Sequence, residues 1–266
     1  MTVQMYDTDE LMSAEDALET LAEALPDTLV LLGGWAVYQT VHDSYMREHG
    51  IPYLGSRDID VGFHVDPSWS DDDLRSSPLS KAIEVAKDMG YNPMGSFRFC
   101  RFIEKGSGRS LTEEESKQVP VYDLFYLYMD IMVDRIHPRQ AEVLGPKALD
   151  EPILARVYDE DITEMVRIGD TEVPVPPPHL LLAMKLKAIP NRQKDDKVIK
   201  DACDIFALLW HSPEGTESVL RLVLTEYPEE CRSGLEAITD QVAGRAAEHL
   251  DIDVESYLGV IRRLGQ

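Results

Sequence analysis

The chain has 266 residues, with 49 acidic against 26 basic side chains and a formal net charge of −23. Such a surface repels phosphate backbones, so the composition excludes a protein that coats nucleic acids without selectivity. The acids are spread along the whole chain and only ten residues are lysine, which is typical of a halophilic protein whose self-repulsion is screened by a high-salt cytoplasm.

Cysteine count and hydropathy narrow the class of protein further. Cys100, Cys203 and Cys231 are far apart and odd in number, which argues against a disulfide framework and favours reduced thiols. The sequence opens with no signal-peptide pattern and contains no run of eighteen apolar residues, so we expect no membrane segment and a cytoplasmic location. The length favours two domains over one.

The first predicted elements surround a pair of glycines. Helical spacing predicts a helix over 13–25, and an apolar run predicts a strand over 28–32. Gly33 and Gly34 follow, and a further helix is predicted over 35–48. Glycines allow a tight turn, and the start of a helix offers free N–H groups to an anion. The sequence therefore predicts a phosphate-binding turn here.

The next strand, predicted over 58–65, opens with Asp58 and Asp60. Residues i and i+2 of a strand project from the same face about 6.6 Å apart, so both carboxylates point toward one spot. Carboxylate oxygens suit Mg²⁺, or Mn²⁺ in its place, with water and substrate phosphates as the remaining ligands. The alternative is a solvated strand end that binds no metal.

Two strands and a loop follow in the middle of the chain. The stretch 97–103 predicts a strand, on which Arg98 and Arg101 bind a phosphate or form surface ion pairs, and 106–118 is polar and predicts a loop. The stretch 124–136 predicts an apolar strand that carries two acids.

Those two acids, Asp130 and Asp134, are costly to bury unless each is paired or binds a cation. The alternative is that they face water. A hairpin is predicted over 165–175, and the prolines of 174–178 form a stiff segment that we take as a domain boundary.

Helices are predicted for the remainder, over 179–189, 194–210, 213–226, 229–249 and 253–264. Lys185 lies on the apolar face of the first of these helices, so its amine either snorkels to the surface or is retained for a phosphate. Six basic residues lie within sixteen positions: Lys185, Lys187, Arg192, Lys194, Lys197 and Lys200. In so acidic a chain, this cluster is the one local place where a triphosphate or an RNA end could bind.

On the second of these helices, Asp201 and Asp204 are neighbours on one side. One reading is that an acid here belongs to a binding site. The other is that the two acids pair on the helix surface with Lys197 and Lys200, four residues before each.

Three motifs, taken in chain order, resemble a known superfamily. They are Gly33-Gly34, Asp58-x-Asp60 and the stretch MKLKAIPNRQKDDKVIKDACDIFALL. They are similar to the nucleotidyltransferases of DNA polymerase β type, in the small prokaryotic branch of abortive-infection toxins. The resemblance implies an α/β nucleotidyltransferase fold, a mixed β-sheet flanked by helices, with a C-terminal helical domain. We expect the nucleotidyltransferase domain at 1–175 and the helical domain at 176–266.

The same resemblance implies the residues of the site. Members of the superfamily carry a third carboxylate on a neighbouring strand. The resemblance assigns this position to Asp130, with Asp134 as the alternative candidate. Gly34 stands where many relatives carry serine, so backbone N–H groups would take the place of that hydroxyl. The implied metal ligands are Asp58, Asp60 and Asp130. The implied catalytic residues are these three aspartates and Lys185. The implied nucleotide-binding residues are Gly33, Gly34, Arg57, Lys185 and Asp204.

The implied activity is transfer of a nucleoside monophosphate from a nucleoside triphosphate to a hydroxyl of RNA, of a protein or of a small molecule, with Mg²⁺. The alternative is a non-catalytic or toxin–antitoxin module that keeps the fold, with a small protein partner.

Overall fold

The structure, a computed structural model, describes residues 5–26, 28–95 and 98–266. Its contacts form two compact units. The strand unit contains Thr8–Trp35 and Ser56–Val175, and the helical unit contains Ala36–Gly55 and Pro176–Gln266. One boundary therefore falls within the predicted proline segment, whereas residues 36–55 go with the helices. That 1–175 and 176–266 are separate domains stays a prediction.

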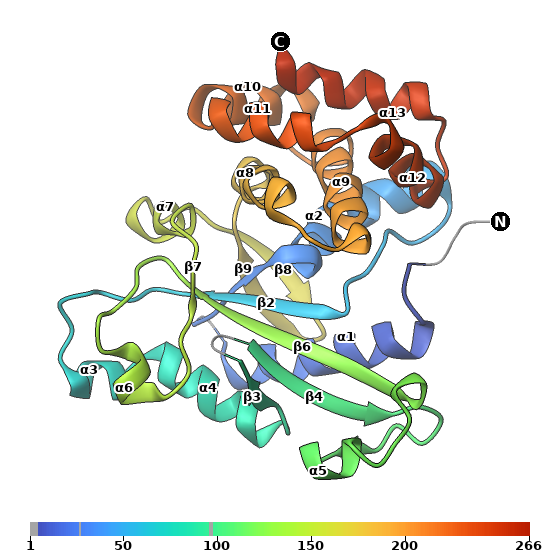
Figure 1. Cartoon of the computed structure of the whole chain (residues 1–266). Helices are drawn as coiled ribbons and strands as arrows, with labels where there is room; N and C mark the ends of the chain where they lie inside the picture. Colours follow the sequence, from blue (N-terminus) through green and yellow to red (C-terminus); the bar gives the residue numbers. More distant parts are fainter. Residues whose placement is uncertain (1–4, 27, 96–97) are drawn as a thin grey trace. The chain divides into compact units, whose positions relative to one another are not determined.

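The strand unit combines a β-sheet, a hairpin and several helices (Figure 1). Its helices are α1 (Thr8–Ala24), α3 (Asp71–Ser76), α4 (Pro78–Asp88), α5 (Glu113–Ser116), α6 (Gln140–Leu144) and α7 (Leu154–Asp159), with the 3₁₀ turn η1 (Val121–Asp123). Its strands are β1 (Val30–Leu32), β2 (Asp58–Phe63), β3 (Asn92–Met94), β4 (Arg98–Glu104), β5 (Ser110–Leu111), β6 (Leu124–Val133), β7 (Leu149–Asp150), β8 (Glu164–Ile168) and β9 (Thr171–Val175).

The sheet is mixed, with the order β1-β2-β6-β4-β3 (Figure 1). β2 and β6 pair in parallel, whereas β1 with β2, β4 with β6 and β3 with β4 pair antiparallel. β5 and β7 extend the sheet beside β4 and β6, and β8 with β9 forms the predicted hairpin. The predicted mixed sheet flanked by helices is confirmed.

The two faces of the central strands differ in character. Ile59, Val61 and Phe63 of β2 are fully buried, and Met129 and Ile131, their neighbours on β6, share that apolar face. Because side chains of a strand alternate between faces, the residues between them project from the other side. The acids of both strands therefore lie together on the second face.

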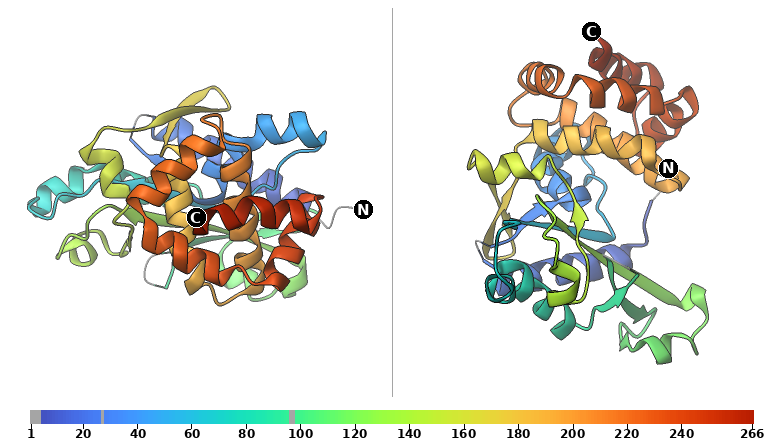
Figure 2. Two further views of the ribbon diagram at one scale, coloured as in Figure 1. Left: turned by 90° about the horizontal axis from the view of Figure 1, so that it is seen from above. Right: turned by 60° about the vertical axis from the view of Figure 1, so that its left-hand side comes forward.

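The helical unit is built around a central helix. Its elements are α2 (Gly33–His49, from Ala36 onward), α8 (Pro178–Ala188), η2 (Ile189–Asn191), α9 (Asp195–Trp210), α10 (Thr216–Glu226), α11 (Pro228–Ala237), α12 (Asp240–Leu250), α13 (Val254–Ile261) and η3 (Arg262–Gly265). α9 contacts α8, α10, α12 and α13. Both views of Figure 2 show α8 to α13 gathered into one bundle.

Three secondary-structure predictions were wrong in detail. The stretch predicted as a loop over 106–118 holds β5 and α5, because Thr112 and Glu115 form a reciprocal capping box. The helix predicted over 229–249 is two helices, since the hydroxyl of Thr239 accepts from the N–H of Val242 and starts α12. β6 ends at Val133 rather than at 136.

One boundary differs from the sequence prediction and another is not tested. α1 begins at Thr8, before the expected start at 13. Phe97, expected to open the strand that became β4, lies outside the described residues.

Within the described residues, no helix is both long and apolar enough to cross a membrane. Cys100, Cys203 and Cys231 are buried free thiols. Burial raises the pKa of Cys231 to about 11 and that of Cys100 to about 12.

Candidate functional site

The turn after β1 is shaped by Gly33, which opens α2 with a φ of +62°. A Cβ at this position would lie 1.8 Å from Oδ2 of Asp60 and 2.8 Å from the Cβ of Asp60. Rotation of the aspartate would relieve the first clash and not the second. Gly33 is therefore required both by its backbone conformation and by the close approach of the Asp60 carboxylate.

The pairing of β2 with β6 brings the three predicted acids together. Its parallel register places Asp60 directly opposite Asp130 and Asp58 opposite Tyr128. Paired residues of neighbouring strands lie about 4.8 Å apart and point to the same face, as do residues two apart on one strand. Asp58 and Asp130 are each only 5% exposed. These three carboxylates form what we call the strand carboxylate cluster.

Arg98 supplies the main positive charge beside this cluster. It pairs with Asp130 across β4 and β6, and its Nε donates to Oδ1 of Asp130 at 2.7 Å while Nη2 donates to Oδ2. These hydrogen bonds, together with the charges of Asp130, Asp58 and Asp60, raise the pKa of Arg98. Its guanidinium lies 4.7 Å from the ring centre of Tyr128. Arg98 thus forms an ion pair with a cluster residue rather than with a surface acid.

Arg57 and Gly34 are the remaining predicted nucleotide-binding residues of the strand unit. Nε of Arg57 lies 3.4 Å from Oδ1 of Asp58, and its Nη1 lies 3.8 Å from Glu10. Gly34 lies in the first turn of α2, where the backbone N–H groups have no carbonyl partner within the helix. Arg57 is therefore a second guanidinium beside the cluster.

Asp134, the substitute for Asp130, is engaged elsewhere. Its Oδ1 accepts from the backbone N–H of Val65 at 2.8 Å, and its Oδ2 lies 2.7 Å from Nδ1 of His64. Arg135 also contacts Oδ2, at 3.0 Å. Asp134 therefore fixes the chain that leaves β2, and Asp130 is the β6 acid that lies beside Asp60.

Lys185 of α8 lies in a buried ion network of the helical unit. Its Nζ is 2.8 Å from Oδ1 of Asp201 and 2.8 Å from Oδ2 of Asp204. Burial alone would lower the pKa of Lys185, but the charges of Asp201 and Asp204 outweigh it and raise that pKa. Lys185 is 8% exposed, so it has not snorkelled to the surface.

The two acids of this network have further partners. Asp201 accepts from Nε of Arg192 at 2.6 Å. Burial would raise the pKa of Asp201, but the charges of Lys185 and Arg192 hold it below its ordinary value. Asp204 accepts from Nζ of Lys200 at 2.5 Å and from the hydroxyl of Tyr53 at 2.7 Å. The expected pairing four residues apart is present for Asp204, whereas Asp201 is held by Lys185 and Arg192.

Sequence reasoning missed Tyr53, because no spacing links a tyrosine between α2 and β2 to an acid 151 residues away. The network also reduces the predicted basic cluster. Lys185 and Lys200 are buried in ion pairs, so less of that charge is exposed to a ligand.

The two groups of residues belong to different units. Asp58, Asp60 and Asp130 lie in the strand unit, and Lys185 and Asp204 lie in the helical unit. That all five act in one site stays a prediction.

A sequence model described as "Nucleotidyl transferase AbiEii toxin, Type IV TA system" matches residues 16–258, which include both groups. The chain belongs to the AbiEii family. The predicted resemblance to abortive-infection nucleotidyltransferases is thereby confirmed, and so is the predicted class of function, a nucleotidyltransferase of a toxin family.

Other comparisons add little to the AbiEii assignment. No protein of curated function matches the chain. Among solved structures, the chain is similar to an antigenic nucleotidyltransferase-like protein from Paracoccidioides brasiliensis, with 15% identity and a TM-score of 0.40, over 85% of this chain and 93% of that one.

Replacing Gly33 with alanine tests how closely the turn and Asp60 are fitted. A positive φ costs an alanine about 1–2 kcal/mol, and the contact with the Cβ of Asp60 adds overpacking of about 1–3 kcal/mol. Gly90→Ala is the matched control, because Gly90 has a φ of +84° and open space around it. Urea unfolding should show a clearly larger loss of unfolding free energy for Gly33→Ala, and equal losses would refute the close approach.

Replacing Lys185 with methionine tests the buried network. Asp201 and Asp204 would lose a buried counter-charge, so we expect unfolding free energy to fall by about 3–5 kcal/mol. Lys194→Met, at an exposed position just before α9, should change it by less than about 0.5 kcal/mol. If the two variants unfold alike in urea, Lys185 does not stabilise the network.

Proposed function

We propose that this AbiEii-family protein transfers a nucleoside monophosphate from a nucleoside triphosphate to a hydroxyl and releases pyrophosphate, with Mg²⁺ or Mn²⁺ held by Asp58, Asp60 and Asp130. The observation that carries the proposal is the register that sets Asp60 beside Asp130, with Asp58 on the same face. The acceptor is a hydroxyl of RNA, of a protein or of a small molecule.

The donor set fits a hard divalent cation. Three carboxylates supply only oxygen ligands, which a hard divalent cation prefers, and the guanidinium groups of Arg98 and Arg57 lie beside them. When bound, the metal would neutralise the triphosphate and orient the attacking hydroxyl.

The chain's own residues would do the positioning. Gly33 lets the Asp60 carboxylate lie against the turn, and Gly34 begins a helix whose N–H groups suit a phosphate. Arg98 orients Asp130 through two hydrogen bonds. For Lys185 and Asp204, burial in ion pairs supports a positioning role over direct contact with phosphate.

The family's description places its members in type IV toxin–antitoxin systems, which implies an antitoxin. We propose a small protein encoded by a neighbouring gene as the partner of this chain. Co-expression of the two genes tests this: the neighbour should relieve growth arrest caused by this chain, and unchanged arrest would contradict the pairing.

Label transfer tests the activity. The protein is incubated with each α-³²P-labelled nucleoside triphosphate, Mg²⁺ and total RNA, and labelled RNA is resolved on a gel. We expect transfer that Asp58→Asn and Asp60→Asn each reduce about 100-fold or more, since each removes a charge that the transition state needs. Asp170→Asn, on the exposed hairpin turn, is the matched control and should retain activity. Transfer that survives both cluster substitutions would refute the metal assignment.

We also propose that the protein works in a high-salt cytoplasm. With a net charge of −23, self-repulsion should weaken as KCl rises from about 0.1 M to about 1 M and the Debye length falls from about 10 Å to about 3 Å. A thermal melt should then show Tm rising by several degrees. A Tm that stays constant or falls would contradict this adaptation.

A further inference from the structure

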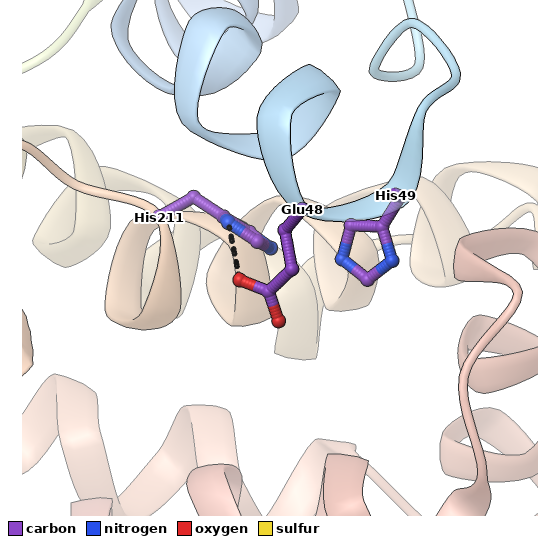
Figure 3. A group of neighbouring side chains, drawn as sticks. All are labelled: Glu48, His49 and His211. Atoms are coloured by element: carbon purple, nitrogen blue, oxygen red, sulfur yellow. Dashed lines mark ion pairs between the residues drawn. The ribbon is translucent and has the colours of Figure 1, made fainter.

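A group of side chains that could hold a metal ion lies within the helical unit, and its chemistry differs from that of the strand carboxylate cluster. Glu48 and His49 close α2, and His211 caps the end of α9. One ligand atom of each residue lies within 4.8 Å of the other two. Figure 3 shows the Glu48 carboxylate between the two imidazole rings in that view.

Three of the four histidine nitrogens of this group are buried without a hydrogen-bond partner among the described residues. The side chain of His211 is 0% exposed, and among the described residues neither of its ring nitrogens has a hydrogen-bond partner. The same holds for Nε2 of His49. Nδ1 of His211 faces Oε2 of Glu48 at 3.8 Å, which is too long for a hydrogen bond. Buried polar atoms are normally paired, so these nitrogens point to a missing ligand.

Neighbouring aromatic groups contact the carboxylate and the rings. The indole Nε1 of Trp210 lies 3.2 Å from both oxygens of Glu48, and the ring of Tyr45 lies 4.3 Å from that of His49 and 5.1 Å from that of His211.

We propose that Glu48, His49 and His211 bind a zinc ion that ties the end of α2 to the end of α9. Two imidazole nitrogens and one carboxylate are a ligand set that zinc accepts, with water in the fourth position. A cavity of about 640 Å³ beside Glu48 and His49, lined also by Asp251 and Asp253, leaves room for that water. Trp210 would orient Glu48 from the outer shell.

The geometry needs only a small adjustment. Tetrahedral bonds of about 2.05 Å set ligand atoms about 3.3 Å apart, so the present spacing must shorten by about 1.5 Å at most. The side chain of Glu48 is 51% exposed and can rotate to supply this. The nitrogen donors also separate this site from the all-oxygen strand cluster, which suits Mg²⁺.

Cobalt substitution tests the site on the full chain after chelator treatment. Co²⁺ is titrated in, its visible d–d absorption is recorded, and Zn²⁺ is then added as competitor. We expect one equivalent of Co²⁺ to give bands of a four- or five-coordinate ion that Zn²⁺ removes, and Zn²⁺ to raise Tm. Glu48→Gln and His49→Gln should each weaken binding about 100-fold or more.

Three controls keep the result specific. Glu48 and His49 are substituted rather than the buried His211, so that the variants fold, which circular dichroism checks. Asp58→Asn, in the strand cluster, and His179→Gln, a histidine of α8 outside the group, should keep the Co²⁺ bands. The proposal is overturned if wild-type protein gives no stoichiometric bands, if Glu48→Gln and His49→Gln bind like wild type, or if Asp58→Asn abolishes the bands.

Discussion

The parallel pairing of β2 with β6 is the constraint on which the candidate active site depends. A shift of that register by one residue would turn Asp130 to the opposite face, among Met129 and Ile131, where an unpaired carboxylate is costly. The apolar residues of both strands fix the register by filling one face. The acids then share the other face, and Gly33 lets Asp60 approach the turn. Core packing and site geometry are thus two consequences of one alignment.

The buried acids of the two units have different partners. In the strand unit, the guanidinium groups of Arg98 and Arg57 lie beside Asp130 and Asp58. In the helical unit, Lys185, Arg192 and Lys200 form ion pairs with Asp201 and Asp204, and these acids are almost fully buried. A buried pair broken on one side is strongly destabilising, which makes this network a fixed part of the fold. The strand cluster, whose three carboxylates supply only oxygen ligands, is the better place for a hard divalent cation.

The sequence predicted the central strands and the hairpin of the strand unit, because alternation, glycines and isolated acids are local signals. Asp58, Asp60 and Asp130 were each placed on strands from such signals. Local signals could not supply the register that joins Asp60 to Asp130, nor the choice of Arg98 as the partner of Asp130, since both depend on strands distant in sequence.

The helices of the helical unit were largely predicted, but the contacts between them were not, for the same reason. Lys185 was recognised on an apolar face, but its acids come from the next helix, and Tyr53 comes from before β2. The break at Thr239 was missed because apolar spacing continues across it while the cap interrupts the backbone. His49 and His211 are 162 residues apart and carry no spacing that marks a shared ligand set.

Direct measurement of Mn²⁺ binding tests most sharply whether the strand carboxylate cluster chelates a divalent ion. Bound and free Mn²⁺ can be counted by electron paramagnetic resonance, in the presence of a non-hydrolysable nucleoside triphosphate analogue. The account predicts Mn²⁺ bound by wild-type protein and lost in Asp60→Asn and in Asp130→Asn, with both variants folded. Equal binding by wild type and both variants would contradict it.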